Sequence, residues 1–168
     1  PAMIQRAAAL HPDLEFILAD GHDLQLDETF DMIILSDLVN DLWDVQTLFQ
    51  RVRKLCKPST RIILNFYSRV WELPLGVVSA LNLAKPVLAQ NWLTMDDVIN
   101  LLRLEGMEVV RSWQEVLLPL RVPLLSPLFN RFLVKMFPFS YFAQTNFILA
   151  RPTETPALNG RKPVVSVL

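Results

Sequence analysis

Residues 14–37, LEFILADGHDLQLDETFDMIILSD, contain two short apolar runs, each closely followed by an aspartate. Leu14–Ala19 ends at the turn dipeptide Asp20-Gly21, and Phe30–Leu35 ends at Ser36-Asp37. Runs of this length without polar alternation are typical of strands that are buried on both faces of a parallel sheet. We therefore expect two core strands with a carboxylate near the carboxyl end of each.

The flanking sequence adds helices and a further strand. Ala2–Leu10 predicts the end of a helix, because Pro12 cannot continue it. Trp43–Leu55 has apolar residues at helical spacing, and Arg61–Phe66 is a third apolar run. The order helix, strand, helix, strand with short connections predicts an open α/β layer with parallel strands.

The second half of the chain predicts one well-marked helix. Thr94 is its expected N-cap and Leu104 its end, since Asp96 and Asp97 in the first turn suit the helix dipole. Four other segments are expected here: a helical cap over Val70–Asn91, a strand over Met107–Trp113, a basic amphipathic helix between proline turns over Leu117–Phe139, and a last strand over Thr145–Ala150.

Composition excludes several classes of site. The chain has four glycines, and the two nearest are 30 positions apart, so no GxGxxG motif or P-loop can be written. One cysteine and two histidines exclude a disulfide framework and a multi-Cys/His zinc site, and no metal site is expected. Scattered basic residues without an aromatic-basic motif argue against nucleic acid as a partner.

Charge is divided unevenly along the chain. Residues 1–50 hold ten Asp and Glu against Arg6 alone, whereas residues 51–168 hold fifteen Lys and Arg against seven acids. The division indicates either two solvated faces of one domain, or an acidic ligand-binding half and a basic, apolar half that meets an anionic or lipid partner. Leu117–Phe139 could likewise dock on anionic lipid or close as a cap over an active site. No secretory signal or membrane span is found, which predicts a cytoplasmic protein, with contact at a membrane surface left open.

Ligands of open α/β sheets bind at the carboxyl ends of the strands. The polar residues expected there follow three successive strands: Asp20, His22 and Asp23 after the first, Ser36 and Asp37 after the second, and Asn65, Tyr67 and Ser68 at the third. A buried strand ends in a carboxylate most readily when that group accepts a hydrogen bond from a ligand or from loop amides, and the alternative is helix capping or an Asx turn. If the reaction needs a general base, the candidates are Asp37, His22 and Tyr67, although packing or turn hydrogen bonding is the alternative role for His22.

Three segments in this order, LEFILADGHDL at 14–24, FDMIILSD at 30–37 and LCKPSTRIIL at 55–64, resemble the central part of a class I S-adenosylmethionine-dependent methyltransferase. Gly106 is similar to the family's turn into its sixth strand, and Phe147–Arg151 to its antiparallel last strand. The resemblance implies a Rossmann-like α/β fold and methyl transfer from S-adenosylmethionine to a small acceptor. The apolar cap and Leu117–Phe139 suggest that this acceptor is hydrophobic or lipid-linked.

The resemblance also implies which residues hold the cofactor. In the family, the aspartate that ends the third strand accepts from the adenine amino group, and this position corresponds to Asp20. The following residues, which line the adenine, correspond to Gly21 and His22. The end of the fourth strand, which lies under the methionine moiety and faces the substrate, corresponds to Ser36, Asp37 and Leu38.

Part of the family pattern has no counterpart in this sequence. The family's strand order is 3-2-1-4-5-7-6, and strands one and two with the glycine-rich loop are absent, which implies an incomplete sheet. Residues 1–152 are then a methyltransferase-like domain truncated at its N-terminus and inactive as a fragment. The strand expected at Leu14–Ala19 must pair directly with Phe30–Leu35, hang loose or find another chain.

The C-terminal residues allow two interpretations. Residues 153–162 predict a linker, and 163–168 resemble the first strand of a GT-A type glycosyltransferase; the alternative is a floppy tail. For the chain as a whole, the alternative function is a non-catalytic Rossmann-like binding or scaffold domain, in solution or at a membrane surface.

Overall fold

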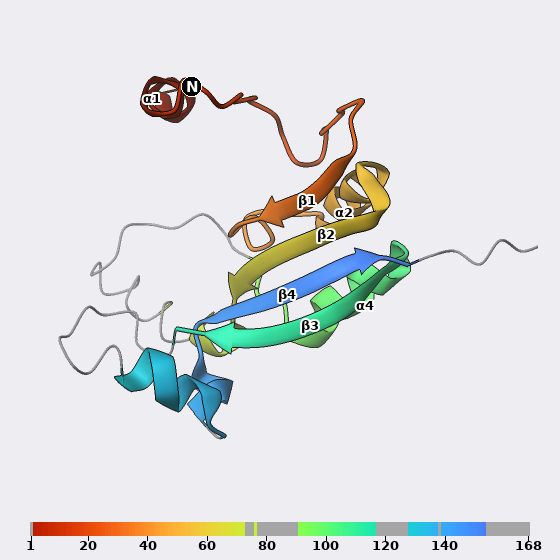
Figure 1. Ribbon diagram of the computed structural model, residues 1–168. Coiled ribbons are helices and arrows are strands. Elements are labelled where there is room, and N and C mark those ends of the chain that lie inside the picture. Colours follow the sequence, from red (N-terminus) through yellow and green to blue (C-terminus); the bar gives the residue numbers. More distant parts are fainter. Residues whose placement is uncertain (1, 73–75, 77–90, 117–127, 138, 154–168) are drawn as a thin grey trace, which may run out of the picture.

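The computed structural model describes residues 2–72, 76, 91–116, 128–137 and 139–153 of the 168-residue chain. Within them, four strands form one mixed sheet in the order β1-β2-β4-β3 (Figure 1). β1 (Phe30–Leu35) pairs in parallel with β2 (Cys56–Tyr67), and β4 (Thr145–Pro152) lies antiparallel between β2 and β3 (Met107–Glu115). The α/β class is confirmed, and the four strands have the order expected for strands 4-5-7-6.

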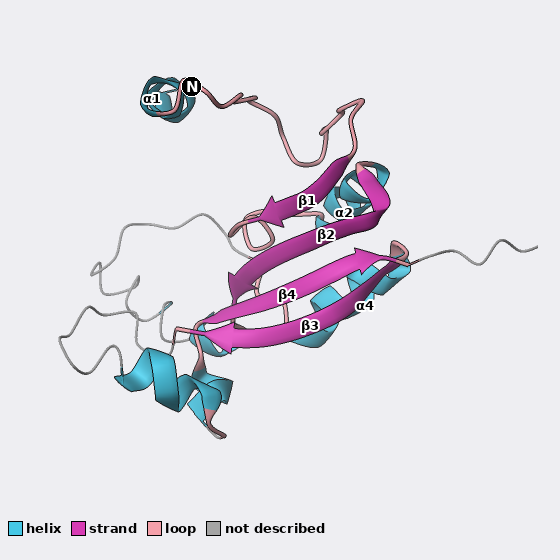
Figure 2. Ribbon diagram, viewed as in Figure 1, coloured by secondary structure: helices cyan, strands magenta, loops and turns pink. Residues whose placement is uncertain are grey.

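Helices α2 (Val45–Lys54) and α4 (Met95–Leu104) cover one face of this sheet (Figure 2). α2 begins at Asp44, whose carboxylate accepts from the Thr47 amide at 2.9 Å. The helices and the covered face of the sheet form one apolar core, because each presents its apolar side to the other. The largest fully buried side chains of this core include Leu48, Phe49, Ile62, Leu64, Phe66, Leu102, Met107 and Ile148.

The predicted N-cap of α4 is confirmed. The Thr94 hydroxyl accepts from the Asp97 amide at 3.2 Å, and the Asp97 carboxylate accepts from the Thr94 amide at 2.9 Å, which completes a capping box. After the helix, Gly106 adopts a left-handed φ of +66°, a conformation that side chains other than glycine disfavour. Both ends of α4 are therefore fixed by local sequence.

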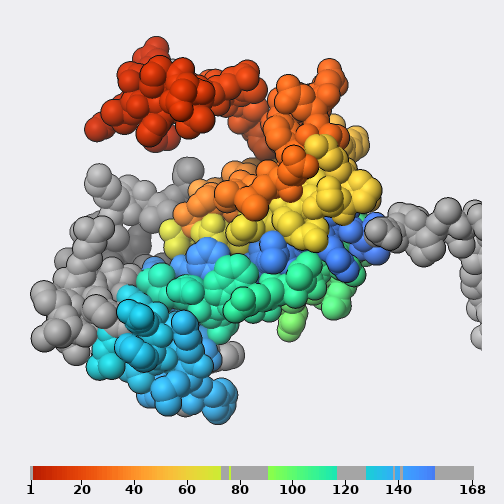
Figure 3. Space-filling model, in the orientation of Figure 1, coloured from red at the N-terminus to blue at the C-terminus, as the bar shows by residue number. Residues whose placement is uncertain are grey.

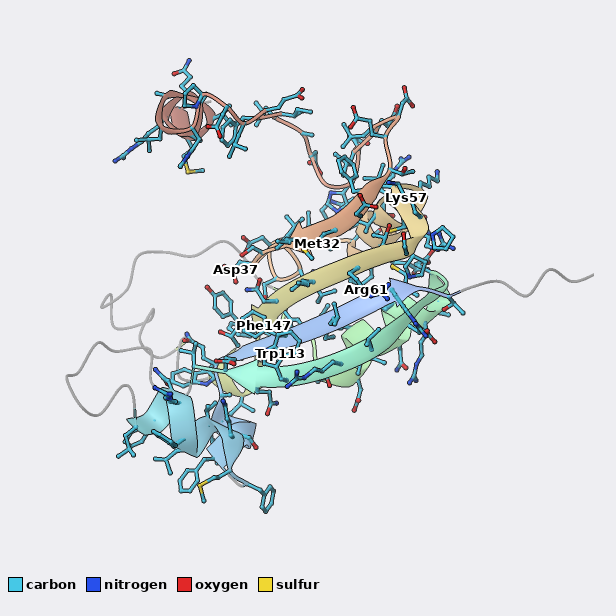
Figure 4. The ribbon with its side chains drawn as sticks, viewed as in Figure 1. Met32, Asp37, Lys57, Arg61, Trp113 and Phe147 are labelled. Carbon is cyan, nitrogen blue, oxygen red and sulfur yellow. The ribbon has the colours of Figure 1, made fainter. Side chains whose placement is uncertain are left out.

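No helix among the described residues covers the other face of the sheet, which is seen in Figures 3 and 4. Met32 and Ile34 of β1 are 57% and 65% exposed there, whereas Leu35 is buried beneath the helices. The prediction that Phe30–Leu35 is buried on both faces is therefore wrong. The physical reason is that successive side chains of a strand point to opposite faces, and α2 and α4 lie on one side only.

The N-terminal segment differs from the prediction in one element. Ala2–Leu10 forms the expected helix, α1. Leu14–Ala19 forms no strand, and Leu14, Ile17 and Leu18 are exposed, Leu18 at 72%. Of the three outcomes expected for this run, direct pairing with Phe30–Leu35 is therefore wrong. None of the described strands lies beside it, so the ladder hydrogen bonds and burial that would make it a core strand are missing.

A β-bulge changes the alternation of side chains along β3. Val109 pairs with Ala150 of β4, but the next paired residue is Arg111, opposite Leu149. Val110 is the extra residue, and the side chains that follow it are shifted by one position relative to β4. As a result, Trp113 stacks on Phe147 at 5.3 Å on the open face of the sheet, and Gln114 pairs with Asn146 on the helix-covered face.

The expected amphipathic helix over Leu117–Phe139 is not a regular helix where it is described. Leu128–Phe132 is one π-helical turn, and Leu133–Lys135 and Phe139–Phe142 are 3₁₀ turns. Aromatic residues are modest helix formers, and Pro127 and Pro138 interrupt the pattern. Most of Val70–Asn91 and all of residues 154–168, with the predicted cap and terminal strand, lie outside the described residues. Among the helices that are described, none is long and apolar enough to span a bilayer.

Replacement of Thr94 by alanine tests the capping box. We expect Thr94→Ala to lower the free energy of unfolding by about 1 kcal/mol, measured by urea denaturation at pH 7. The Thr94 hydroxyl and amide hold the pKa of Asp97 below its ordinary value. This part of the stability is present above the ordinary aspartate pKa and is lost as the pH falls through the lowered pKa, so the effect of the variant shrinks in acid.

Thr153→Ala is the matched control, since Thr153 is exposed and its amide contact with the Gly106 carbonyl does not need the hydroxyl. Equal losses in the two variants, or a Thr94→Ala effect that does not change with pH, would contradict the capping role.

Candidate functional site

The carboxyl ends of β1 and β2 bring Asp37, Asn65 and Tyr67 together at one edge of the sheet. Figure 4 shows Asp37 at this edge. Asp37 follows β1 with a φ of +54°, and its carboxylate accepts a hydrogen bond from the side-chain amide of Asn65. Burial raises the pKa of Tyr67, and the negative charges of Asp37 and Asp41 raise it further. The edge therefore combines an exposed carboxylate with a phenol that stays protonated at neutral pH.

Asn40 fixes the loop that carries Asp37. Its side chain is 1% exposed; Oδ1 accepts from the Tyr67 amide at 2.8 Å, and Nδ2 donates to the Asn91 carbonyl at 2.9 Å. The Asn91 amide donates in turn to the Asn40 carbonyl at 2.7 Å. Sequence reasoning did not select Asn40, and the only available signal was an amide residue shortly after the end of a strand.

A cleft of about 430 Å³ lies at the same end of the sheet but on its helix-covered face, whereas Asn65 pairs with Phe147 on the open face. It lies where β2 ends, where α4 begins, and where β3 and β4 lie side by side. At its base, the Gln114 Nε2 donates to the Asn146 Oδ1 at 3.3 Å, and Asn146 is 3% exposed. The residues that line the cleft are Ser68, Arg69, Val70, Thr94, Met95, Asp96, Gln114 and Asn146. Sequence reasoning selected Ser68 as a polar residue at a strand end and Thr94 only as a cap, and the polar Asn146 within the apolar run 145–150 was a further signal for the site.

The predicted adenine-binding residues form a separate group on the loop before β1. Asp20 Oδ1 accepts from the His22 amide at 2.9 Å and contacts the His22 Nδ1 at 2.8 Å, and these contacts lower the pKa of Asp20. The His22 Nε2 accepts from the Asp44 amide at 3.3 Å, and its ring stacks on Trp43 at 4.7 Å. This loop therefore docks against the start of α2.

The six expected cofactor residues thus fall into two groups. The first group, Asp20, Gly21 and His22, belongs to the loop that packs against α2. A Cβ added to Gly21 would come within 3.3 Å of a methyl group of Leu48 in that helix. Ser36 and Asp37 are exposed at the end of β1, and Leu38 packs partly against the core. In the described part of the chain, no hydrogen bond or ion pair joins the first group to the second.

Geometry also separates the three candidate bases. Both ring nitrogens of His22 are engaged, one with Asp20 and the other with the Asp44 amide, so no lone pair of this imidazole faces solvent as a free acceptor. The Tyr67 phenol is held protonated, whereas the Asp37 carboxylate is exposed after the end of β1. For metals, the described residues contain no cluster of three His, Cys, Asp or Glu side chains.

Comparison with known proteins gives one family match and several structural matches. The family model described as "Methyltransferase domain" matches residues 1–64. The magnesium protoporphyrin IX methyltransferase of Synechocystis PCC 6803 with bound SAH is similar, with a TM-score of 0.57, 14% identity, and coverage of 90% of this chain and 60% of that chain. A search of curated proteins finds no match.

Two further structures extend the comparison. A S-adenosylmethionine-dependent methyltransferase from Clostridium acetobutylicum has a TM-score of 0.58 and 12% identity, over 91% of this chain and 72% of that chain. A structure described as a pericyclic reaction enzyme has a TM-score of 0.58 and 13% identity, over 91% of this chain and 34% of that chain.

These matches show the fold, which is the Rossmann-like fold of class I methyltransferases. The chain spans 60% of the length of the Synechocystis enzyme and 34% of the pericyclic enzyme. Since the pericyclic enzyme has the same fold, the chemistry of this chain must be argued from its site.

Replacement of Asp37 by asparagine tests the arrangement at the strand ends. We expect Asp37→Asn to lower the pKa of Tyr67, because one of two nearby negative charges is removed. The pKa should stay above its ordinary value, since burial is the larger cause. NMR titration of ¹³C-labelled tyrosine in a Tyr141→Phe background, which leaves Tyr67 as the one tyrosine, measures it directly.

The control is Asp31→Asn, which removes an exposed carboxylate that pairs with Lys57 at the start of β1. It should leave the Tyr67 titration unchanged. A Tyr67 pKa that responds equally to both variants, or to neither, is incompatible with the arrangement described.

Proposed function

We propose that this chain serves in the transfer of a methyl group from S-adenosylmethionine to a small acceptor with a large apolar part, such as a hydrophobic or lipid-linked molecule. The methyltransferase-domain match over residues 1–64 and the methyltransferase fold support it. The observation that carries the proposal is the edge of the sheet at which Asp37, Asn65 and Tyr67 meet, with the cleft on the helix-covered face at the same end of the sheet. Parallel strands place ligands at this edge.

The chemistry makes modest demands on the protein. Bound S-adenosylmethionine would supply an electrophilic methyl carbon on a sulfonium sulfur. A lone pair of the acceptor forms the new bond to that carbon while the carbon–sulfur bond breaks, and the sulfur keeps the electron pair as a neutral thioether. Alignment supplies much of the lowering of the barrier, so neither a protein nucleophile nor a strong acid is needed.

Asp37 is the group placed to take a proton where the acceptor loses one on methylation. Its carboxylate is exposed at the end of β1, and Asn65 holds it by a hydrogen bond. Tyr67 would instead donate a hydrogen bond, because its raised pKa keeps the phenol neutral. His22 would act in packing, since its two nitrogens are engaged with Asp20 and Asp44.

The residues present fit one side of a site for S-adenosylmethionine. Asp20 keeps Oδ2 free of the contacts that its Oδ1 makes with His22, and the carboxylate is exposed, so it can accept from an amino group such as that of adenine. Ser36 and Asp37 can hold the amino acid end through a hydroxyl and a carboxylate. Gly21 and Leu38 would complete the lining.

The apolar part of the acceptor is proposed from side chains near the cleft. Val70 and Met95 line the cleft itself. The turns at 128–142 adjoin it, because the Trp71 indole donates to the Phe142 carbonyl at 2.9 Å, and these turns expose large apolar side chains, with Phe137 at 87%. Exposed aromatic residues beside a cleft are typical of a surface that binds apolar ligands.

Calorimetric titration of the 168-residue chain with S-adenosylhomocysteine tests the proposal. We expect binding that Asp20→Asn weakens about 5- to 10-fold, because a charged acceptor is replaced by a neutral one. Asp23→Asn is the matched control, an exposed aspartate of the same loop, and should leave the affinity unchanged.

Absence of binding would contradict the proposal and favour the alternative, a non-catalytic binding or scaffold domain. Binding that Asp20→Asn and Asp23→Asn weaken equally would contradict the assignment of Asp20.

A further inference from the structure

We infer that the base of the cleft recognises a neutral carboxamide group on the acceptor. The inference deepens the proposed function and rests on it for the identity of the cleft as the acceptor site. It is argued from Ser68, which sequence reasoning placed at the carboxyl end of a strand, and from Gln114 and Asn146, which it did not select.

The Gln114–Asn146 pair leaves one donor group and one acceptor side by side. Gln114 Nε2 donates to Asn146 Oδ1, so the Asn146 Nδ2 and the Gln114 Oε1 remain available among the contacts of the described residues. The register of β3 on β4 places these residues directly opposite each other. An amide that accepts through its carbonyl and donates through its N–H matches this pair of groups.

Ser68 adds a hydroxyl to the same cleft. It is 7% exposed, its amide donates to the Gln144 carbonyl at 2.7 Å, and its carbonyl accepts from the Trp71 amide. The hydroxyl makes no cap hydrogen bond to the short turn that follows it. A hydroxyl and an amide that line the same cleft can both meet a polar group of a ligand.

Two other polar residues of the cleft, Thr94 and Arg69, already have partners. The Thr94 hydroxyl donates to the Asp97 carboxylate at 2.6 Å and accepts from the Asp97 amide. Arg69 lies 3.7 Å from Glu72, and both of these side chains are exposed. A polar group of the ligand would therefore form its hydrogen bonds with the Gln114–Asn146 pair at the base of the cleft, while Val70 and Met95 contact apolar parts of the ligand.

Charge argues against an ionised ligand group. The cleft holds one cation, Arg69, and one carboxylate, Asp96, with Asp97 and Glu72 close by. This excess of negative charge disfavours a carboxylate or phosphate. An ammonium group has three donors and no acceptor, so it would leave the Asn146 Nδ2 unsatisfied. A carboxamide satisfies both sides without a charge.

The test uses benzamide, benzoate and benzylamine, three probes with the same ring, and follows the side-chain amide resonances of ¹⁵N-labelled protein. We expect benzamide to shift the resonances of Asn146 and Gln114 with a dissociation constant in the millimolar range, as is usual for a ligand of this size. Benzoate and benzylamine should bind at least about 5-fold more weakly, because each leaves one group of the amide pair unmatched.

Variants of Gln114 locate the binding. Gln114→Leu should weaken benzamide binding about 3- to 10-fold, the effect of one neutral hydrogen bond. Gln50→Leu is the matched control, an exposed glutamine of α2 that contacts Glu105. Gln114→Glu keeps the shape of the side chain, so it covers the case in which Gln114→Leu fails to fold, and it should shift the preference towards benzylamine.

The inference is overturned if no probe shifts these resonances, if benzoate binds as tightly as benzamide, or if Gln114→Leu and Gln50→Leu behave alike. None of these readouts needs S-adenosylmethionine. A failure here therefore leaves the cofactor titration with Asp20→Asn to decide the proposed function independently.

Discussion

The side chain of Asn40 joins three segments that the fold would otherwise leave independent at the candidate site. Its amide accepts from the last residue of β2 and donates to the carbonyl of Asn91, and its own backbone carbonyl accepts from Asn91. A buried amide satisfied on both sides holds its loop in one position, because any displacement leaves a buried polar group without a partner. The placement of Asp37 beside Tyr67, and of the chain that approaches the start of α4, depends on this contact.

The elements that sequence reasoning located correctly are those whose signal is local. Thr94 and Asp97, three positions apart, are typical of a capping box. The spacing of Leu48, Phe49 and Val52 gives α2 one apolar side. Leu14–Ala19 shows why the same reasoning fails elsewhere. An apolar run predicts that a segment can be buried as a strand, but burial also needs a neighbouring strand and a covering layer, and neither is encoded within the run.

The residues of the candidate site also divide into those with a local signal in the sequence and those whose position depends on distant segments. Asp37 and Tyr67 could be placed at one edge of the sheet because parallel strands end together. Ser68 could be placed at the end of its strand in the same way, but Gln114 and Asn146 could not be placed beside it, since their meeting depends on how β3 and β4 align. The role of His22 likewise depends on Asp44, twenty-two positions away, whose backbone amide donates a hydrogen bond to Nε2 of the imidazole.

The bulge at Val110 determines which side chain of β3 faces the cleft, and therefore how polar the cleft is. Had β3 alternated without interruption, Trp113 would face the helices and Gln114 would point to the opposite side, leaving Asn146 with an aromatic neighbour in place of an amide. Removing or inserting one residue of β3 upstream of Gln114 would therefore place the apolar Trp113 at the base of the cleft in place of Gln114. The register of β3 on β4 thus determines how polar the cleft is as much as the residue types do.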